Sequence, residues 1–493
     1  MFDMLRINRE HYEGRTYAVD GRSIACRAYV DVPYCIRPVD PIQRLNVFVP
    51  EGFFVGGSVN GYDAETAPVF LPNSVGGYLP GPAEEPGINK RTGMPNTLFT
   101  ALERGCVVVS GGVRGRTSGT RSTEFFEGGS TSFLGEDGGV KVGRAPALVV
   151  DMKAIIRFLR HNSDVLPGNV ERIITNGTSA GGALSALAGS TGNDPSYEPY
   201  LDRIGAADAR DDVFASSCYC PIHNLENADA AYEWQFSELA DYHRTKHIKT
   251  GSGLRRVSDD GVMSSEQMNL SAELKDLFPA YVNSLGLVDK SGRALTLDEG
   301  GRGSFLEYMI DRVIESAQHE LDTHFTAECL TDLAALGSEV ERLGALTIRD
   351  GRAVALDWDA YVRAITRMKP TPAFDALDLS SPENEEFGDE RIEGRHFSAF
   401  GFSHSSVESE LASPEIVRMM NPVACVGMAD LAPHWRIRHG SFDRDTSLAI
   451  PAILALILQG QGVDVDFALP WGIPHCGDYD QAELFDWIDG ICG

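Results

Sequence analysis

The stretch ITNGTSAGGAL, residues 174–184, places a serine where it could act as a nucleophile. Residues 177–181, GTSAG, match G-x-S-x-G, the pattern of a sharp strand-to-helix turn whose neighbours must lack bulk. A β-branched run precedes this turn and a helix of small residues follows it, which is the context in which the motif has meaning. The pattern therefore favours Ser179 as a nucleophile over a serine that only serves a tight turn.

A serine hydroxyl needs a histidine to take its proton and an acid to orient that histidine. In the order serine, acid, histidine, His475 lies in the loop WGIPHCGDYD directly after the last expected strand. Asp443 and Asp445 follow the preceding expected strand, and their spacing puts both carboxylates on one side of an extended loop. Asp445 also suits the N-cap of a helix expected to start near Thr446. The spacing favours Asp443 as the acid but leaves Asp445 open.

An oxyanion would need two backbone N–H donors. Ala180 supplies one at the start of the helix after the serine, and Gly76 or Gly77 in the loop NSVGGYLPG supplies the other. A second glycine cluster, SGGVRGR, lacks the G-x-G-x-x-G spacing of a dinucleotide site. The nine cysteines show none of the paired spacing of zinc sites. This chemistry requires no metal and no organic cofactor.

Strand-like runs alternate with helical stretches, which predicts an α/β sheet. The expected strands lie at residues 45–50, 106–112, 171–177, 212–222, 434–440 and 464–470. Residues 145–162 carry apolar side chains on one helical face, a buried helix is expected from Thr446, and residues 480–491 form a closing helix. These helices would cover the sheet.

Residues 226–425 differ from the rest, because charges are dense there and strand signals are absent. Amphipathic stretches at 271–285 and 325–343 predict helices. We therefore expect one catalytic domain, residues 1–225 and 426–493, interrupted by a mostly helical lid formed by residues 226–425.

The charge balance and the apolar content of the chain limit which partners it can bind. Lys and Arg number 43 against 71 Asp and Glu, a net charge of −28, which repels nucleic acid and anionic membrane surfaces. The longest apolar run, from Ser447, is too short to span a bilayer. The N-terminus does not read as a secretory signal, so a cytoplasmic location is expected, with secretion after signal removal as the alternative. A monomer is the simplest expectation for an oligomeric state that the sequence does not specify.

Several longer motifs resemble those of the bacterial tannases, within the tannase and feruloyl esterase group of α/β-hydrolases. They are SVGGYLPG, VVVSGGVRGR, NGTSAGGALSALAGSTGN, CYCPIHNLENADAAYEW, RMKPTPAFD, RHGSFDRDTS and PWGIPHCGDYD, and together they cover nearly the whole chain. The resemblance implies an α/β-hydrolase fold with a large, mostly helical lid. It also implies a triad of Ser179, Asp443 and His475, which settles the choice between the two aspartates.

The same resemblance implies a galloyl pocket in which Lys369, Glu383 and Asp445 hold the phenolic hydroxyls. Two carboxylates can accept hydrogen bonds from these hydroxyls while an ammonium contacts the remaining oxygen. Fungal relatives join a cysteine before the nucleophile to one after the histidine, but Thr178 precedes the serine here. The missing disulfide agrees with a reducing compartment.

The expected function is a serine ester hydrolase that cleaves galloyl esters, such as hydrolysable tannins and alkyl gallates, to gallic acid and an alcohol through a galloyl-serine intermediate. One alternative is a feruloyl or other aryl esterase, which needs the same triad but no trihydroxy pocket. Another is a non-catalytic binding protein of the α/β-hydrolase fold, against which the complete set of serine, acid and histidine argues.

Overall fold

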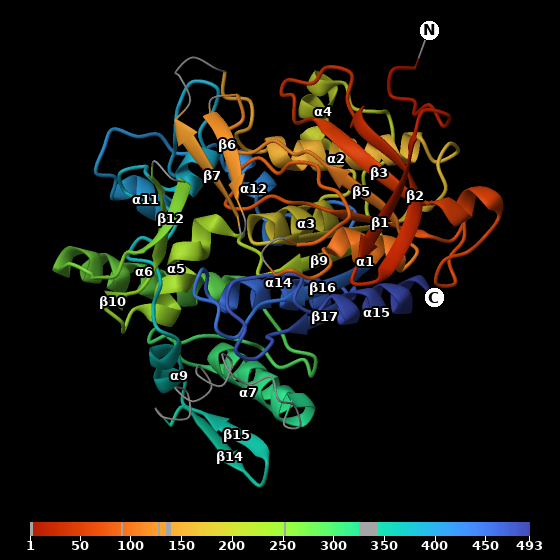
Figure 1. Cartoon of the computed structure of the whole chain (residues 1–493). Helices are drawn as coiled ribbons and strands as arrows, with labels where there is room; N and C mark the ends of the chain where they lie inside the picture. Colours follow the sequence, from red (N-terminus) through yellow and green to blue (C-terminus); the bar gives the residue numbers. More distant parts are fainter. Residues whose placement is uncertain are drawn as a thin grey trace.

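A mixed sheet runs through the part of the chain that this computed structural model describes, namely residues 3–89, 92–119, 121–126, 129–134, 140–250, 253–324 and 344–493. Its strands lie in the order β1-β2-β3-β5-β4-β8-β9-β16-β17 (Figure 1). Their bounds are β1 (Glu13–Val19), β2 (Arg22–Pro33), β3 (Arg44–Pro50), β4 (Pro68–Pro72), β5 (Val107–Gly111), β8 (Asn169–Thr178), β9 (Ala215–Tyr219), β16 (His434–Arg438) and β17 (Asp464–Ala468). The strands from β5 to β17 are parallel, and β1, β2 and β3 pair antiparallel at one edge.

The central strands are buried because helices cover both faces of the sheet. Every residue of β4, β5 and β9 is buried. Each strand predicted from the sequence is present, and the predicted α/β class is confirmed. The strands β1, β2 and β4 were not predicted, since β1 and β2 carry many polar residues and β4 is a five-residue run with a proline at each end.

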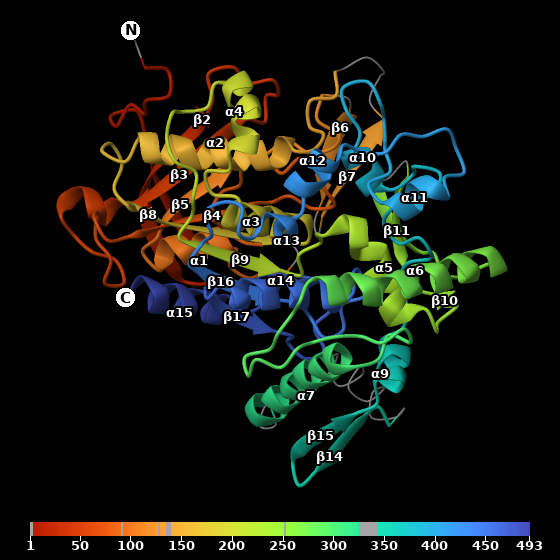
Figure 2. The same ribbon diagram turned by 180° about the vertical axis from the view of Figure 1, so that it is seen from behind.

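Helices flank this sheet in the order α1 (Thr97–Glu103), α2 (Ala147–His161), α3 (Ala180–Ser190), α4 (Glu198–Ile204), α14 (Ala449–Gly460) and α15 (Gln481–Cys492), with short 3-10 turns η1 (Glu51–Val55) and η2 (Pro195–Tyr197). α3 packs on β8 and β9 and also against α2, whereas α1 lies beside α15 near the C-terminus (Figure 2). The predicted helices at 145–162 and 480–491 are confirmed. α14 begins three residues later than expected.

The chain leaves the sheet after β9 and returns in the neighbouring strand β16. The helices between them are α5 (Leu225–Phe236), α6 (Ser265–Ser284), α7 (Ser304–His324), α9 (Trp358–Ile365), α10 (Pro382–Glu386), α11 (Ala399–Ser403), α12 (Pro414–Met419) and α13 (Pro422–Cys425). In both views α5, α6 and α11 lie at the end of the sheet away from the C-terminus, while α7 and α9 project from it (Figures 1 and 2).

The predicted absence of strands from this insertion is wrong. Three short pairs occur there, β10 (Asp241–Tyr242) with β13 (Gly261–Val262), β11 (Thr245–Thr250) with β12 (Gly253–Ser258), and β14 (Leu346–Arg349) with β15 (Arg352–Leu356). Strands as polar as TKHIKT and GLRRVS show no apolar alternation, so periodicity does not reveal them. A further hairpin, β6 (Arg121–Phe126) with β7 (Gly129–Leu134), follows β5. The predicted helix at 271–285 lies in α6, and the one at 325–343 falls outside the described residues.

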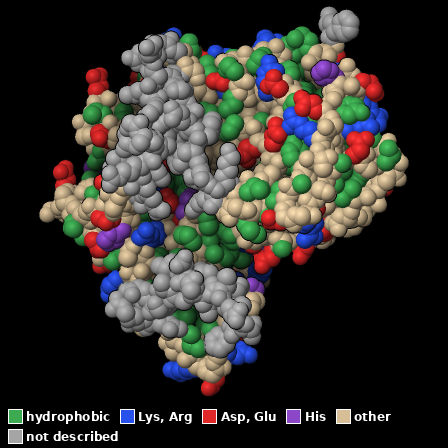
Figure 3. Space-filling view, in the orientation of Figure 1, with side chains coloured by type: hydrophobic (Ala, Val, Ile, Leu, Met, Phe, Trp, Pro, Cys, Tyr) green, Lys and Arg blue, Asp and Glu red, His purple; other side chains and the backbone are tan. Residues whose placement is uncertain are grey.

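The outer surface mixes charges of both signs. On the face drawn in Figure 3, the coloured acidic and basic side chains are interspersed rather than gathered into separate regions. None of the helices in the described residues has both the length and the apolar character to cross a membrane.

Candidate active site

Ser179 stands at the turn between β8 and α3 with φ 63° and ψ −124°, a conformation that non-glycine residues rarely adopt. The surrounding glycines make this turn possible. A Cβ at Gly177 would lie 2.2 Å from the Gly181 carbonyl oxygen, and one at Gly181 would lie 2.5 Å from Asn73 Oδ1. The small residues of G-x-S-x-G are therefore required by close backbone approach, and they leave the serine partly exposed above the N-terminus of α3.

His475 lies between the serine and an aspartate. Its Nε2 is 2.9 Å from Ser179 Oγ, and its Nδ1 is 2.7 Å from Asp443 Oδ2. The three side chains come from loops after β8, β16 and β17, whose carboxyl ends meet at one edge of the sheet. The His475 loop packs closely on the elbow, since a Cβ at Gly477 would lie 1.9 Å from Thr178 Oγ1. The structure thus brings together the serine, acid and histidine expected from the sequence.

Electrostatics prepare this histidine for proton transfer. Burial alone would raise the pKa of Asp443, but His475, His439 and the backbone N–H of Asp445 hold it at about 2. Burial opposes a charged imidazole at His475, yet the carboxylates of Asp443 and Asp445 outweigh it and raise the pKa of His475 well above its ordinary value. The fixed negative charges therefore favour the protonated form of the His475 ring.

Asp445 belongs to the same loop as Asp443, and both carboxylates face His475 Nδ1. Its Oδ2 is 3.8 Å from His475 Nδ1, and its Oδ1 is 3.7 Å from Lys369 Nζ. The alternative role as helix N-cap is wrong, because α14 begins at Ala449 with Leu448 at its N-cap. The backbone N–H of Leu448 donates instead to Oε1 of Gln235, a residue of α5 in the insertion, at 2.9 Å. Asp445 is left to face Lys369 and the histidine.

The loop with Gly76 and Gly77 lies against the elbow. Asn73 donates to the carbonyl oxygens of Asn176 and Gly181, at 3.0 Å each. At the other end of the loop Tyr78 donates to the Ile222 carbonyl, and the Ile222 N–H donates to the Ser179 carbonyl oxygen.

Between described residues, no hydrogen bond takes up the N–H of Gly76 or Gly77, and the N–H of Ala180 is at the first position of α3. These N–H groups remain the candidate oxyanion donors.

Lys369 reaches this edge of the sheet from the insertion. Its Nζ lies 4.1 Å from the centroid of the Phe374 ring, and its backbone N–H donates to Tyr232 Oη at 2.9 Å. Glu383, on α10, is close enough to Lys369 and Asp445 for their charges to act on it, although burial dominates and raises its pKa. The structure therefore gathers Lys369, Glu383 and Asp445 around one space next to His475.

The neighbouring glutamates on α10 have other surroundings. Glu385 pairs with Arg116 and with Arg144. Glu386 is fully buried, and burial raises its pKa well above the ordinary range. Lys369 is the largest charge interaction acting on Glu383, whereas Arg144 is the largest acting on Glu386.

The contacts that hold Lys369 were not predicted from the sequence. Arg367 and Glu233 form an ion pair with both side chains at 0% exposure, and Arg367 Nη1 lies 2.8 Å from Glu233 Oε2. One turn earlier on α5, Asp229 accepts the N–H groups of Phe374 and Asp375 at 2.9 Å each. The spacing of Asp229 and Glu233, four residues apart on one face of α5, was the one available sign of these contacts, because their partners lie far away in the sequence.

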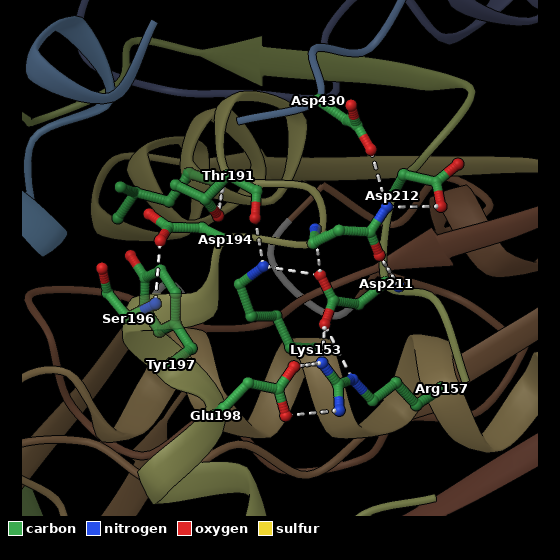
Figure 4. Close-up of polar contacts among 12 residues, drawn as sticks. Lys153, Arg157, Thr191, Asp194, Ser196, Tyr197, Glu198, Asp211, Asp212 and Asp430 are labelled. Carbon is green, nitrogen blue, oxygen red and sulfur yellow. Dashed lines mark hydrogen bonds and ion pairs between the residues drawn. The ribbon is translucent and has the colours of Figure 1, made fainter. Parts of the chain in front are cut away.

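A network of ion pairs contacts the C-terminal end of α3, the helix that follows Ser179 (Figure 4). Lys153 of α2 donates to the carbonyl oxygen of Thr191, the C-cap of α3, and lies 2.7 Å from Asp211 Oδ1. Arg157 Nε also lies 2.7 Å from Asp211, and its guanidinium reaches Glu198. Burial lowers the pKa of Lys153 despite the carboxylate beside it. A cation at the C-terminal end of α3 favours the helix dipole.

Metal-ligating residue types come together at the same place. In the described part of the chain, Cys220, Asp443 and His475 place ligand atoms within 4.8 Å of one another. Two of them are already joined by the 2.7 Å hydrogen bond. Asp443 and His475 are thus oriented towards each other and towards Ser179.

The amino-acid sequence is similar to those of several known proteins. The BD-FAE family matches residues 139–216. Esterase LipQ of Mycobacterium tuberculosis is 30% identical over 122 residues, which is 24% of this chain and 28% of that protein. Esterase LipC of the same organism is 47% identical over 58 residues, 12% of this chain and 14% of that protein. The chain thus aligns with about a quarter of the first of these curated relatives and about a seventh of the second.

Solved structures match over the full length. A tannase from Lactobacillus plantarum is 44% identical, with 99% of this chain and 100% of that one covered and a TM-score of 0.88. The Fusobacterium nucleatum tannase is 42% identical, with 99% of each chain covered and a TM-score of 0.89. A tannin acyl hydrolase solved in complex with ethyl gallate is 45% identical, again with 99% of each chain covered, at a TM-score of 0.87.

Fold and site define a carboxylic ester hydrolase of the α/β-hydrolase class. A strained serine turn, a hydrogen-bonded histidine and a parallel sheet with an insertion are common to that class. The chain belongs to the bacterial tannase family.

Proposed function

We propose that this protein hydrolyses galloyl esters, with Ser179, His475 and Asp443 as its catalytic triad. Ser179 Oγ attacks the ester carbonyl while His475 Nε2 takes its proton, and the N–H groups of Ala180 and of Gly76 or Gly77 hold the oxyanion. The imidazolium then gives its proton to the leaving alcohol, which leaves a galloyl-serine. A water molecule activated by His475 cleaves this ester, releasing gallic acid and restoring the serine.

The single observation that carries this proposal is the unbroken chain of hydrogen bonds from Ser179 Oγ through His475 to Asp443, at 2.9 and 2.7 Å. A binding protein of the same fold would not need a serine held at φ 63° beside a histidine whose pKa two carboxylates raise. The strain of the turn and the buried acid both cost stability, and hydrolysis explains why they are present.

The substrate class follows from the charges around Lys369. A galloyl ring presents three adjacent hydroxyls, which can donate to Asp445 and Glu383 while Lys369 contacts a hydroxyl oxygen. Lys369 and Glu383 belong to the insertion, which supports a role for residues 226–425 as a lid that supplies the ring contacts. Rings without these hydroxyls would leave buried polar groups unpaired and would react more slowly.

Initial rates with methyl gallate, methyl ferulate and methyl benzoate test both the triad and the galloyl specificity. Ser179→Ala is expected to remove turnover of all three esters without changing the melting temperature by more than a few degrees. Lys369→Met and Asp445→Asn are expected to reduce kcat/KM for methyl gallate at least tenfold and for methyl benzoate much less.

Lys275→Met, which removes a half-buried lysine of the same insertion that pairs with Glu238, serves as the matched control. Equal rates on all three esters in the unmodified enzyme would refute the galloyl assignment and leave the esterase class standing.

We also propose a cytoplasmic location. The cysteines in the described residues are all free thiols, and Thr178 replaces the cysteine that a disulfide at the nucleophile would need. Fractionation of native cells with an antibody against the protein tests this proposal, and recovery of the protein outside the cells would contradict it.

A further inference from the structure

A second cavity lies between the sheet domain and the insertion, away from the serine. It has a volume of 530 Å³, within the range of small-molecule sites. Its walls come from the N-terminal end of α2, from α4, from the turn after α10 and from the start of α12. α2 and α12 lie side by side in both views (Figures 1 and 2). None of the triad or the Lys369 group lines this cavity.

Most of the wall is apolar and includes two aromatic rings. Tyr200 and Ile204 come from α4, Phe387 follows α10, and Ala412 and Ile416 come from the segment that leads into α12. Flat apolar walls of this kind suit an aromatic ring, because burial removes the ring faces from water.

Arg144 is one of several charged side chains in this wall, and it is deeply buried. It is only 5% exposed, and neither its Nε nor its Nη2 makes a hydrogen bond to any described residue. Nη2 lies 3.3 Å from Glu393 Oε1 without the geometry of a hydrogen bond, while Nη1 donates to the Arg116 carbonyl oxygen at 2.5 Å. Buried guanidinium N–H groups without acceptors are costly, so they favour a ligand that supplies oxygen atoms.

The cations at the cavity lie near carboxylates. Arg203 lies 2.6 Å from Glu390, Arg395 lies 2.6 Å from Asp389, and Arg144 Nη1 lies 3.2 Å from Glu385 Oε1. Charge therefore does not single out Arg144, but its buried Nε and Nη2 make no hydrogen bond to a described residue, so it has donors left for an oxygen ligand. Guanidinium groups bind carboxylates through two parallel N–H···O bonds.

We propose that this cavity is a second ligand site that takes a small aromatic carboxylate, with the carboxylate on Arg144 and the ring between Tyr200, Phe387 and Ile416. Arg116 links this site to the candidate oxyanion loop. Its carbonyl oxygen accepts a hydrogen bond from Arg144, and its Nε donates to the Gly77 carbonyl oxygen at 2.9 Å. The proposal concerns binding and does not depend on which esters the enzyme cleaves.

Calorimetric titration with benzoate and 3,4,5-trihydroxybenzoate tests the site after Ser179 has been blocked with phenylmethanesulfonyl fluoride and labelling has been verified by mass. The blocked enzyme is expected to keep one benzoate site per chain. Benzyl alcohol, which lacks the carboxylate, is expected to bind at least tenfold more weakly.

Ala412→Trp, which fills the cavity, is expected to remove this binding, and Arg144→Met is expected to weaken it at least tenfold. Arg210→Met, an exposed arginine outside the cavity, is the matched control and is expected to bind as the parent does. Esterase activity of the unblocked variants shows that they have folded.

A crystal structure with benzoate locates the ligand whether or not Ser179 can be labelled, which separates this proposal from the assignment of the nucleophile. Benzoate density between Arg144 and Phe387 is the expected result. Absence of ligand there, or binding that persists unchanged in both Ala412→Trp and Arg144→Met, would overturn the proposal.

Discussion

Replacing Asp445 with asparagine should move the pH dependence of catalysis towards acid. The carboxylate lies 3.8 Å from His475 Nδ1 and helps to raise the pKa of that histidine. His475 must be neutral to accept the serine proton, so activity rises with pH through its pKa. Removing a negative charge destabilises the imidazolium, lowers the pKa of His475 and shifts the acid limb of the profile to lower pH.

The distance sets the size of this shift. Two unit charges about 4 Å apart interact by about 1 kcal/mol in bulk water and about 4 kcal/mol at an effective dielectric constant near 20. Asp445 is 26% exposed and shares its charge with Lys369, so we use the lower figure. One kcal/mol corresponds to a shift of roughly 0.7 pH units. Asp443, whose pKa is about 2, stays ionised throughout the pH range of the assay, so its titration does not contribute to the pH profile.

The assay is kcat/KM for methyl benzoate between pH 4 and 9, because this ester has no ring hydroxyls that Asp445 could bind. Asp464→Asn removes an exposed carboxylate at the far end of β17 and serves as the control of equal charge change. The acid limb of Asp445→Asn is expected about 0.7 pH units below that of the parent, with Asp464→Asn within 0.2. An unchanged limb, or one moved to higher pH, would refute the electrostatic reasoning.

Two further perturbations act on the supports of the site. Gly477→Ala introduces a Cβ 1.9 Å from Thr178 Oγ1, so it should displace the His475 loop and lower kcat at least tenfold; adding Thr178→Ala should recover part of the loss, and no recovery would contradict the steric cause. Lys153→Met leaves Asp211 buried without its ammonium partner and should reduce the free energy of unfolding in urea by about 3 kcal/mol. A loss below about 1 kcal/mol would show that Arg157 alone satisfies Asp211.

The parts of the fold that the sequence predicted are those with strong local patterns. The strand before Ser179 has a β-branched centre, and the helix after it consists mostly of small and apolar residues, with glycines at fixed offsets from the serine. The order of serine, acid and histidine along the chain then located His475, because each residue follows a strand of the same sheet.

Long-range polar contacts were beyond prediction from one sequence. The Arg367–Glu233 ion pair joins residues 134 positions apart, and neither residue stands in a pattern that distinguishes it from a surface charge. The N-cap expectation for Asp445 failed for the same reason, since Gln235 of α5 bonds Leu448 from another part of the chain. The polar hairpins of the insertion depend on pairing partners and not on local apolar alternation.

The role of Lys369 and Glu383 required the resemblance to known tannases. Taken alone, each is a charged residue in a loop or an acidic run, and both would read as solvated. The structure adds that Glu383, rather than Glu385 or Glu386, shares its surroundings with Lys369 and Asp445. Assignment of a residue in a run of acids therefore needed three-dimensional information.

Trapping of the acyl-enzyme tests the central claim most directly. The enzyme is mixed with excess methyl gallate, quenched with acid within milliseconds, and analysed by mass spectrometry of the intact chain and of its peptides. The account predicts one added galloyl group per chain, located on the peptide that contains Ser179 and absent from Ser179→Ala. A galloyl group on another residue, or rapid release of gallic acid by the Ser179→Ala variant, would contradict it.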